Sequence, residues 1–188
     1  MNNSETSYSL ENADIDTVPI VTLIDALHKL LKELIVLADD IYTTKPYNLQ
    51  GVSTIGSHVR HILDHVDAFL SGLEIGHIKY HERVRDTEVE RNKKVAILHL
   101  ENLIKEIIKI KNKPIETKVI IEDILSVDHP PYIFTSTLGR ELAFVFNHSF
   151  HHYAIISIII KSYGGFVPED FGYAPSTMLW LRSCVHTR

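Results

Sequence analysis

Histidine is the residue type whose number and spacing in this sequence indicate chemistry. The chain has 12 histidines among 188 residues, and half of these 12 fall in two short windows. The windows contain His58, His61 and His65, and then His148, His151 and His152. Because neutral imidazole is a common ligand of divalent transition metals, the two windows predict a metal site wherever the fold brings them together.

Helical spacing places part of each window on one face. At about 100° per residue, His58 and His65 differ by about 20° around a helix axis, and His61 lies within about 60° of both. His148 and His152 are four residues apart, so their rings lie on one face, which apolar neighbours direct inward. Spacing alone leaves the third ligand open, and histidines hydrogen-bonded in a core without metal are the alternative.

Four long helices are predicted to carry these windows. The first begins at a cap on Asp16 or Thr17, carries apolar residues at alternating three- and four-residue spacing, and ends at Lys45-Pro46. The others span about residues 53–73, 91–111 and 137–163. The last of them ends at Gly164-Gly165 and is apolar nearly all round, which predicts the most buried element and favours a homodimer.

The remaining segments add little regular structure to this prediction. The β-branched segments 117–121 and 132–135 predict a short hairpin across the turn at 128–131, and a final short helix begins near Ser176. The sequence therefore predicts an all-α fold. Its architecture is a four-helix bundle with a hairpin in the crossover between helices three and four, and with a short C-terminal helix.

Composition limits the classes of function. Residues 1–16 are expected to form a disordered lead, and residues 17–188 a single domain. A net charge of −5, from 19 basic and 24 acidic residues, argues against a nucleic-acid partner. The single cysteine, Cys184, excludes an internal disulfide and favours a reducing compartment. With no secretory signal and no uninterrupted apolar run of about 18 residues, we expect a cytoplasmic protein without a membrane partner.

Two motifs resemble the DinB-like four-helix-bundle superfamily. Thr54–His65, with the sequence TIGSHVRHILDH, is similar to the second-helix signature of that superfamily, and Asn147–Ala154, NHSFHHYA, resembles its fourth-helix H-x-x-x-H. The resemblance covers about residues 18–165. It implies a bundle with up-down-down-up helix order and a metal bound by one histidine of helix two and two of helix four.

Carried over residue by residue, the resemblance assigns the metal ligands to His61, His148 and His152. His58 and His65 are then candidates for catalytic acid–base work or for orienting the ligands, and Asn147 for supporting them. Zinc or nickel is the expected metal, with iron or manganese as alternatives. The superfamily includes bacillithiol and mycothiol S-transferases, so the resemblance implies transfer of a low-molecular-weight thiol to an electrophilic small molecule.

The approach to the third helix supplies the candidate substrate contacts. Arg83 and Arg85 are predicted to bind an anionic group, with Tyr80 beside them, and the alternative is a solvated, salt-bridged segment. Two other functions stay open. One is hydrolysis at the metal, and the other is a non-enzymatic, metal-stabilised helical bundle in stress response or partner binding. An open coordination position would favour an enzyme over a structural site.

Overall fold

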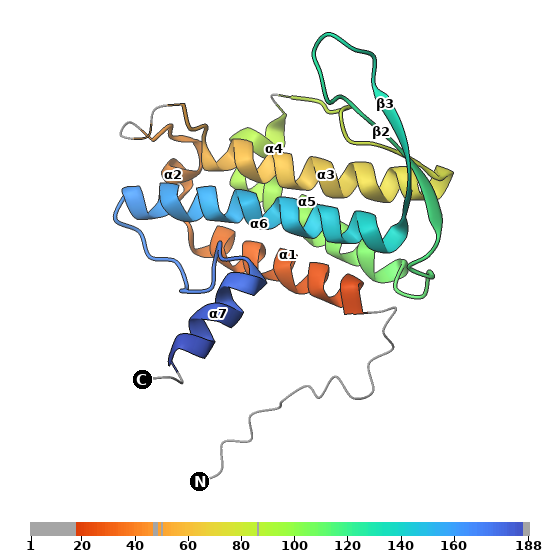
Figure 1. The fold of residues 1–188 in the computed structure, drawn as a ribbon. Helices are drawn as coiled ribbons and strands as arrows, with labels where there is room; N and C mark the ends of the chain where they lie inside the picture. The colour runs from red at the N-terminus through yellow and green to blue at the C-terminus, as the bar shows by residue number, and fades with distance from the viewer. Residues whose placement is uncertain (1–17, 47–48, 50, 86, 186–188) are drawn as a thin grey trace.

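The computed structural model describes residues 18–46, 49, 51–85 and 87–185. Four long helices lie side by side and enclose the hydrophobic core (Figure 1). They are α1 (Val18–Val36), α3 (Ile55–Ile75), α5 (Lys93–Lys109) and α6 (Leu138–Ser162). Helix α6 packs against both α1 and α3, and α5 packs against the same two helices. The two histidine windows therefore lie on adjacent helices, α3 and α6.

A three-stranded mixed sheet lies at one end of these helices (Figure 1). The shorter elements are β1 (His77–Lys79), β2 (Lys118–Asp123), β3 (Tyr132–Thr137), α2 (Asp39–Thr43), α4 (Glu88–Arg91) and α7 (Pro175–Val185). Strand β2 is central, because it pairs in parallel with β1 and antiparallel with β3. The sheet thus connects the end of α3 to the start of α6.

The prediction of an all-α four-helix bundle is wrong, because the protein is α+β. The predicted hairpin forms as β2 and β3, and its β-branched residues explain that pairing. Strand β1, however, adds a third strand directly after α3, and the described part of the chain has seven helices. A strand of three residues is too short for an alternating pattern to be recognised in the sequence.

Local signals set the helix ends. Thr54 Oγ1 accepts a hydrogen bond from the Ser57 backbone N–H at 3.0 Å and caps α3, which ends at Gly76 in the left-handed conformation. The predicted first helix is divided, since α1 ends at Val36 and α2 follows as a separate short helix. The expected cap at Asp16 or Thr17 and the expected disordered lead lie outside the described residues.

Helix α6 is long and apolar enough to cross a membrane by length and composition. Residues 142–160 contain no Asp, Glu, Lys or Arg, but polar residues such as Asn147, His148 and Ser157 interrupt the apolar run. In the structure, α6 packs against α1 and α3 and buries an apolar face that includes Leu142, Val145 and Ile156. A core helix of this kind passes the same test, so α6 is weak evidence for a membrane.

An ion pair between α3 and α5 leads to a pH-dependent prediction. His99 Nε2 lies 2.6 Å from Asp67 Oδ2, and this carboxylate raises the pKa of His99. The pKa of His99 is about 6.5 in the unfolded chain, and below that pH the pair contributes its full stabilisation. The contribution is lost as the pH rises through the higher pKa that His99 has in the folded protein. Because both side chains are partly exposed, we expect a contribution of about 0.5–1 kcal/mol.

Chemical denaturation of wild type and His99→Gln measures this contribution. The difference in free energy of unfolding should be largest near pH 6 and shrink toward pH 9. A difference that stays constant over this range would show that the pair does not titrate as described.

Candidate metal centre

Five imidazole rings from α3 and α6 form one group, here called the histidine cluster. Its members are His58, His61, His65, His148 and His152. His61 Nε2 lies 2.9 Å from His148 Nε2, and His58 Nδ1 lies 3.0 Å from His152 Nδ1. One nitrogen from each of His61, His65 and His148 lies within 4.8 Å of the other two. The structure thus brings the two predicted windows together.

The packing of α3 against α6 creates this cluster. Both helices bury an apolar face, which includes Val59 and Ile62 on α3 and Val145 on α6. The histidines lie beside these residues on the same inward surfaces, so docking of the helices places their rings between the backbones. His65 and His152 are buried, at 5% and 8% exposure, and the other three rings are half-buried.

Burial and crowding keep these rings neutral at pH 7. Burial is the largest cause of the lowered pKa at every member of the cluster, and neighbouring histidines add to it at most of them. The pKa of His61 falls to about 2, that of His152 to about 3, and those of His65 and His148 to about 4. Neutral imidazoles carry a free lone pair, which a transition metal requires.

Hydrogen bonds orient individual rings. His65 Nδ1 donates to the His61 carbonyl oxygen at 2.9 Å, so the lone pair of neutral His65 is on Nε2. A ligand histidine in a metal site is often oriented by this kind of bond. Arg83 Nη1 lies 2.6 Å from His61 Nδ1 and 3.3 Å from its Nε2, which brings a guanidinium cation to the edge of the cluster.

The cluster fits a divalent transition metal. Its donors are imidazole nitrogens, and within the described residues no carboxylate completes the group of His61, His65 and His148. Imidazole nitrogens bound to one tetrahedral metal at about 2.0–2.1 Å lie about 3.3 Å apart, so the His61 Nε2 and His148 Nε2 atoms, 2.9 Å apart, need to separate by only about 0.4 Å to share a metal. His58 Nε2 is buried and has no hydrogen-bond partner among the described residues, so this ring nitrogen is still unsatisfied.

The structure offers two alternatives for the third ligand. The His152 ring, which the resemblance assigns, has its centroid 4.5 Å from that of His61 and 4.8 Å from that of His148. Its Nδ1, however, faces His58. His65 completes the group with the shorter mutual nitrogen distances, and its ring stacks on His148 with centroids 4.0 Å apart.

Tyr80 contacts the cluster from the sheet side. Its ring stacks on His65, and its hydroxyl donates to Glu141 Oε2 at 2.9 Å. Ser136 Oγ donates to the other Glu141 oxygen at 2.6 Å. Burial, followed by the nearby carboxylate, raises the pKa of Tyr80. Tyr80 therefore holds the His65 ring in place, and its hydroxyl is already occupied.

Sequence reasoning did not assign a structural role to Glu141. This residue is buried at 1% exposure, between the inward positions Leu138 and Leu142. An acidic residue on the buried face of a helix was the signal that could have identified it, because a buried carboxylate needs hydrogen-bond donors.

A cavity of about 390 Å³ opens onto His61. Arg83 and Arg85, the candidate substrate contacts, line it together with Ser57, Arg60 and Glu90. Arg60 Nε is paired with Glu90 at 2.8 Å, whereas Arg83 and Arg85 form no ion pair with a carboxylate of the described residues. The two arginines therefore give one side of the cavity a positive charge next to His61.

Two residues of the second window lie outside the cluster. Asn147 and His151 are exposed on α6. The Asn147 side chain makes no hydrogen bond to the cluster within the described part of the chain, so the structure does not bring this candidate to the site. The exposed His151 ring contacts the cluster from outside, with its centroid 5.1 Å from that of His152 and 6.5 Å from that of His148.

The fold and site define an α+β protein whose helical core carries a cluster of neutral histidines. No family model matches the chain. Over 109 residues, the chain is 33% identical to FK506-binding protein 5 of Rhizopus delemar, and the match covers 56% of this chain. The match spans only 28% of the length of that relative, so it does not assign the chain to a family.

Proposed function

We propose that the protein is a metal-dependent enzyme. In this proposal the histidine cluster holds a divalent transition metal, zinc or nickel first, and a low-molecular-weight thiol is transferred to an electrophilic small molecule. The observation that supports a metal site is the convergence of five histidine rings from two packed helices, each ring with a lowered pKa. The transfer reaction comes from the resemblance of Thr54–His65 and Asn147–Ala154 to the DinB-like superfamily.

The cavity beside His61 supports an enzyme over a structural site. A substrate can reach the cluster from this side, because the cavity is lined by His61. Arg83 and Arg85 would bind an anionic group of the thiol or of the electrophile. An anionic group bound by these two arginines at the cavity wall would lie next to His61.

Three neutral ligands leave the full charge of the cation in place, and a bound metal would supply the Lewis acidity that favours the ionised form of a thiol. The residues of the chain then have separate tasks. Arg83 holds the anionic group, and Tyr80 keeps the His65 ring in position. His58 has an unpartnered buried Nε2 and is the candidate to accept the thiol proton.

Hydrolysis is the second candidate activity, because the same cavity admits water. A non-enzymatic, metal-stabilised protein is the third, and it would be favoured if four histidines bound the metal and closed the site. Thiol consumption by the metal-loaded protein, measured with glutathione, cysteine and coenzyme A and with an alkylating electrophile, discriminates among them. Turnover that falls at least tenfold in Arg83→Gln supports the transferase, while ester hydrolysis without thiol consumption supports the hydrolase.

The metal itself is tested by metal content per chain. We expect the His61→Ala/His148→Ala double variant to bind one equivalent of zinc or nickel less than wild type after reconstitution and dialysis. His28→Gln is the matched control, since His28 is exposed on α1, away from the cluster. Equal metal content in the double variant and wild type would exclude the histidine cluster as the metal site.

A further inference from the structure

A second group of potential metal ligands lies on the sheet, apart from the histidine cluster. Along β1 and the turn that follows it, Ile78 and Tyr80 are buried, while the alternate residues His77, Lys79 and His81 lie on the opposite face. Glu122 of β2 is the register partner of Lys79. Strand geometry thus places the Glu122 carboxylate between two histidines.

Both imidazoles approach this carboxylate. His77 Nε2 lies 3.1 Å from Glu122 Oε2, and His81 Nε2 lies 3.6 Å from Glu122 Oε1. Ligand atoms of His81, Glu82 and Glu122 all lie within 4.8 Å of one another. The Glu122 and His81 side chains are 19% and 14% exposed, so the group is partly shielded from water.

The hydrogen bond of His81 determines where its lone pair lies. His81 Nδ1 lies 3.1 Å from the Glu122 carbonyl oxygen, which can only accept, so Nδ1 carries the proton. In the neutral ring the Nε2 lone pair then faces the negatively charged Glu122 carboxylate. Two acceptors that face each other need a cation between them, which is either a proton on Nε2 or a metal ion.

His77 gives an independent indication. Its Nε2 is buried and makes no hydrogen bond within the part of the chain that the structure describes, although Glu122 Oε2 is only 3.1 Å away. The ring N–H is therefore not directed at the carboxylate. A buried ring nitrogen that close to an oxygen, but not bonded to it, is unusual unless both atoms serve a third partner.

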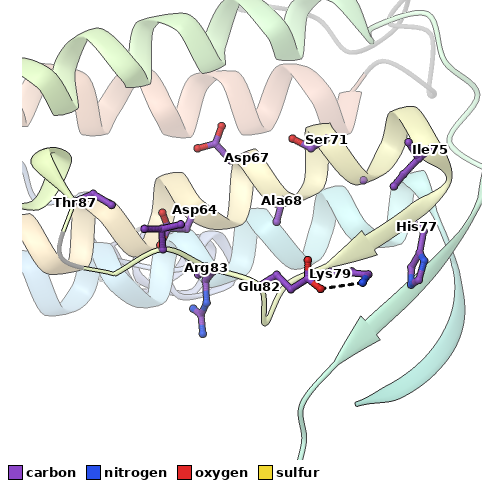
Figure 2. A pocket seen from close by; sticks show the side chains of 12 residues that line it. Asp64, Asp67, Ala68, Ser71, Ile75, His77, Lys79, Glu82, Arg83 and Thr87 are labelled. Atoms are coloured by element: carbon purple, nitrogen blue, oxygen red, sulfur yellow. Dashed lines mark hydrogen bonds and ion pairs between the residues drawn. The ribbon is translucent and has the colours of Figure 1, made fainter. Parts of the chain in front are cut away.

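We propose that His81, Glu82 and Glu122, with His77 as a further donor beside Glu122, form a second site for a divalent transition metal such as zinc. Imidazole and carboxylate donors together suit this class of ion, whereas magnesium and calcium prefer oxygen ligands. Lys79 is the present partner of both carboxylates, with its Nζ 2.9 Å from Glu82 Oε1 (Figure 2) and 3.7 Å from Glu122 Oε2.

The site borders a cavity of its own. His77, Lys79 and Glu82 line a pocket of about 430 Å³ between α3 and the segment after β1 (Figure 2). Asp64 and Asp67 line the wall on α3. The pocket gives an ion a path to Glu82 and His77 that does not pass through the histidine cluster. This proposal therefore does not depend on the proposed enzyme function.

Zinc binding to the full chain at pH 7.5, measured by equilibrium dialysis with a competing chelator, tests the site. We expect Glu122→Gln to lose one equivalent of bound zinc, or to bind that equivalent at least tenfold more weakly, and His81→Gln to do the same. Glu116→Gln is the matched control, because Glu116 is an exposed glutamate just before β2 and has no ion pair among the described residues. Circular dichroism verifies that each variant is folded.

The His61→Ala/His148→Ala variant separates the two sites. It should keep the equivalent that Glu122→Gln loses, and a variant with all three substitutions should bind none. Loss of zinc in Glu122→Gln but not in His61→Ala/His148→Ala would support this site and contradict the proposed catalytic metal. Zinc binding by folded Glu122→Gln and His81→Gln equal to that of wild type would overturn the second site, leaving His77, His81 and Glu122 as ion pairs only.

Discussion

Zinc at 100 times its dissociation constant should raise the midpoint of thermal unfolding by about 5–10 °C through the histidine cluster alone. A ligand at that concentration that binds only the folded state stabilises it by about 2.7 kcal/mol. For a chain of this length, 1 kcal/mol corresponds to about 2–4 °C. The measurement is made in Glu122→Gln, so that the sheet site does not contribute. Adding His61→Ala and His148→Ala should abolish the shift.

The same assay identifies the third ligand. Interatomic distances favour His65, whose Nε2 lone pair is fixed by the bond from Nδ1 to the His61 carbonyl oxygen. The resemblance favours His152. We expect the zinc shift to be lost in one of His65→Ala and His152→Ala and at least half retained in the other. His151→Ala is the control, since it removes an exposed imidazole next to His152. Full shifts in both variants would contradict a three-histidine centre built on α3 and α6.

The periodic parts of the sequence predicted most of the helical core. The apolar spacing on α1 is a local signal, and its residues are buried in the structure. The hairpin was predicted for the same reason, since β-branched residues on both sides of a proline-containing turn favour strands. These signals depend on neighbours in the chain, so one sequence is sufficient to recognise them.

The sheet as a whole could not be predicted in this way. Strand β1 has three residues, and it forms because β2 lies beside it in the folded chain. Residues 77–79 and 118–123 are far apart in sequence, so nothing local indicates their pairing. For this reason the fold class was predicted as all-α, and His77, His81 and Glu122 were not recognised as a group.

The candidate site could likewise be predicted only where its features depend on local sequence. Two histidine windows on buried helix faces indicated that the rings would meet, and they do. The choice among His58, His61 and His65 depends on how α3 is rotated toward α6 and on side-chain rotamers, which helical spacing does not determine. Tyr80 was proposed as a substrate contact because it is close to Arg83 in the sequence. Its contacts with His65 and Glu141 result instead from the path of β1 beside α3, which the sequence does not show.

Replacing Gly72 by alanine should destabilise the protein by about 3 kcal/mol or more and lower the midpoint of thermal unfolding by about 6–12 °C. A Cβ at this position would lie 2.5 Å from the Ile78 Cα and 2.7 Å from the His77 carbonyl oxygen. Both are backbone atoms of β1, so neither can move aside by a rotamer change. Ser71→Ala is the control, because Ser71 is the exposed neighbour of Gly72 on α3. The free energy of unfolding of this variant should stay within about 0.5 kcal/mol of the wild-type value.

The close contact of Gly72 with β1 also couples both proposed metal sites to one packing interface. Strand β1 carries His77 of the sheet site, and the residues that follow include Tyr80, which stacks on His65. If β1 moves outward to make room for the methyl group, His77 and Tyr80 move with it. Folded Gly72→Ala should therefore bind zinc at least tenfold more weakly at the sheet site and lose less affinity at the histidine cluster. Wild-type stability and zinc affinity in Gly72→Ala would show that α3 and β1 are not in this close contact.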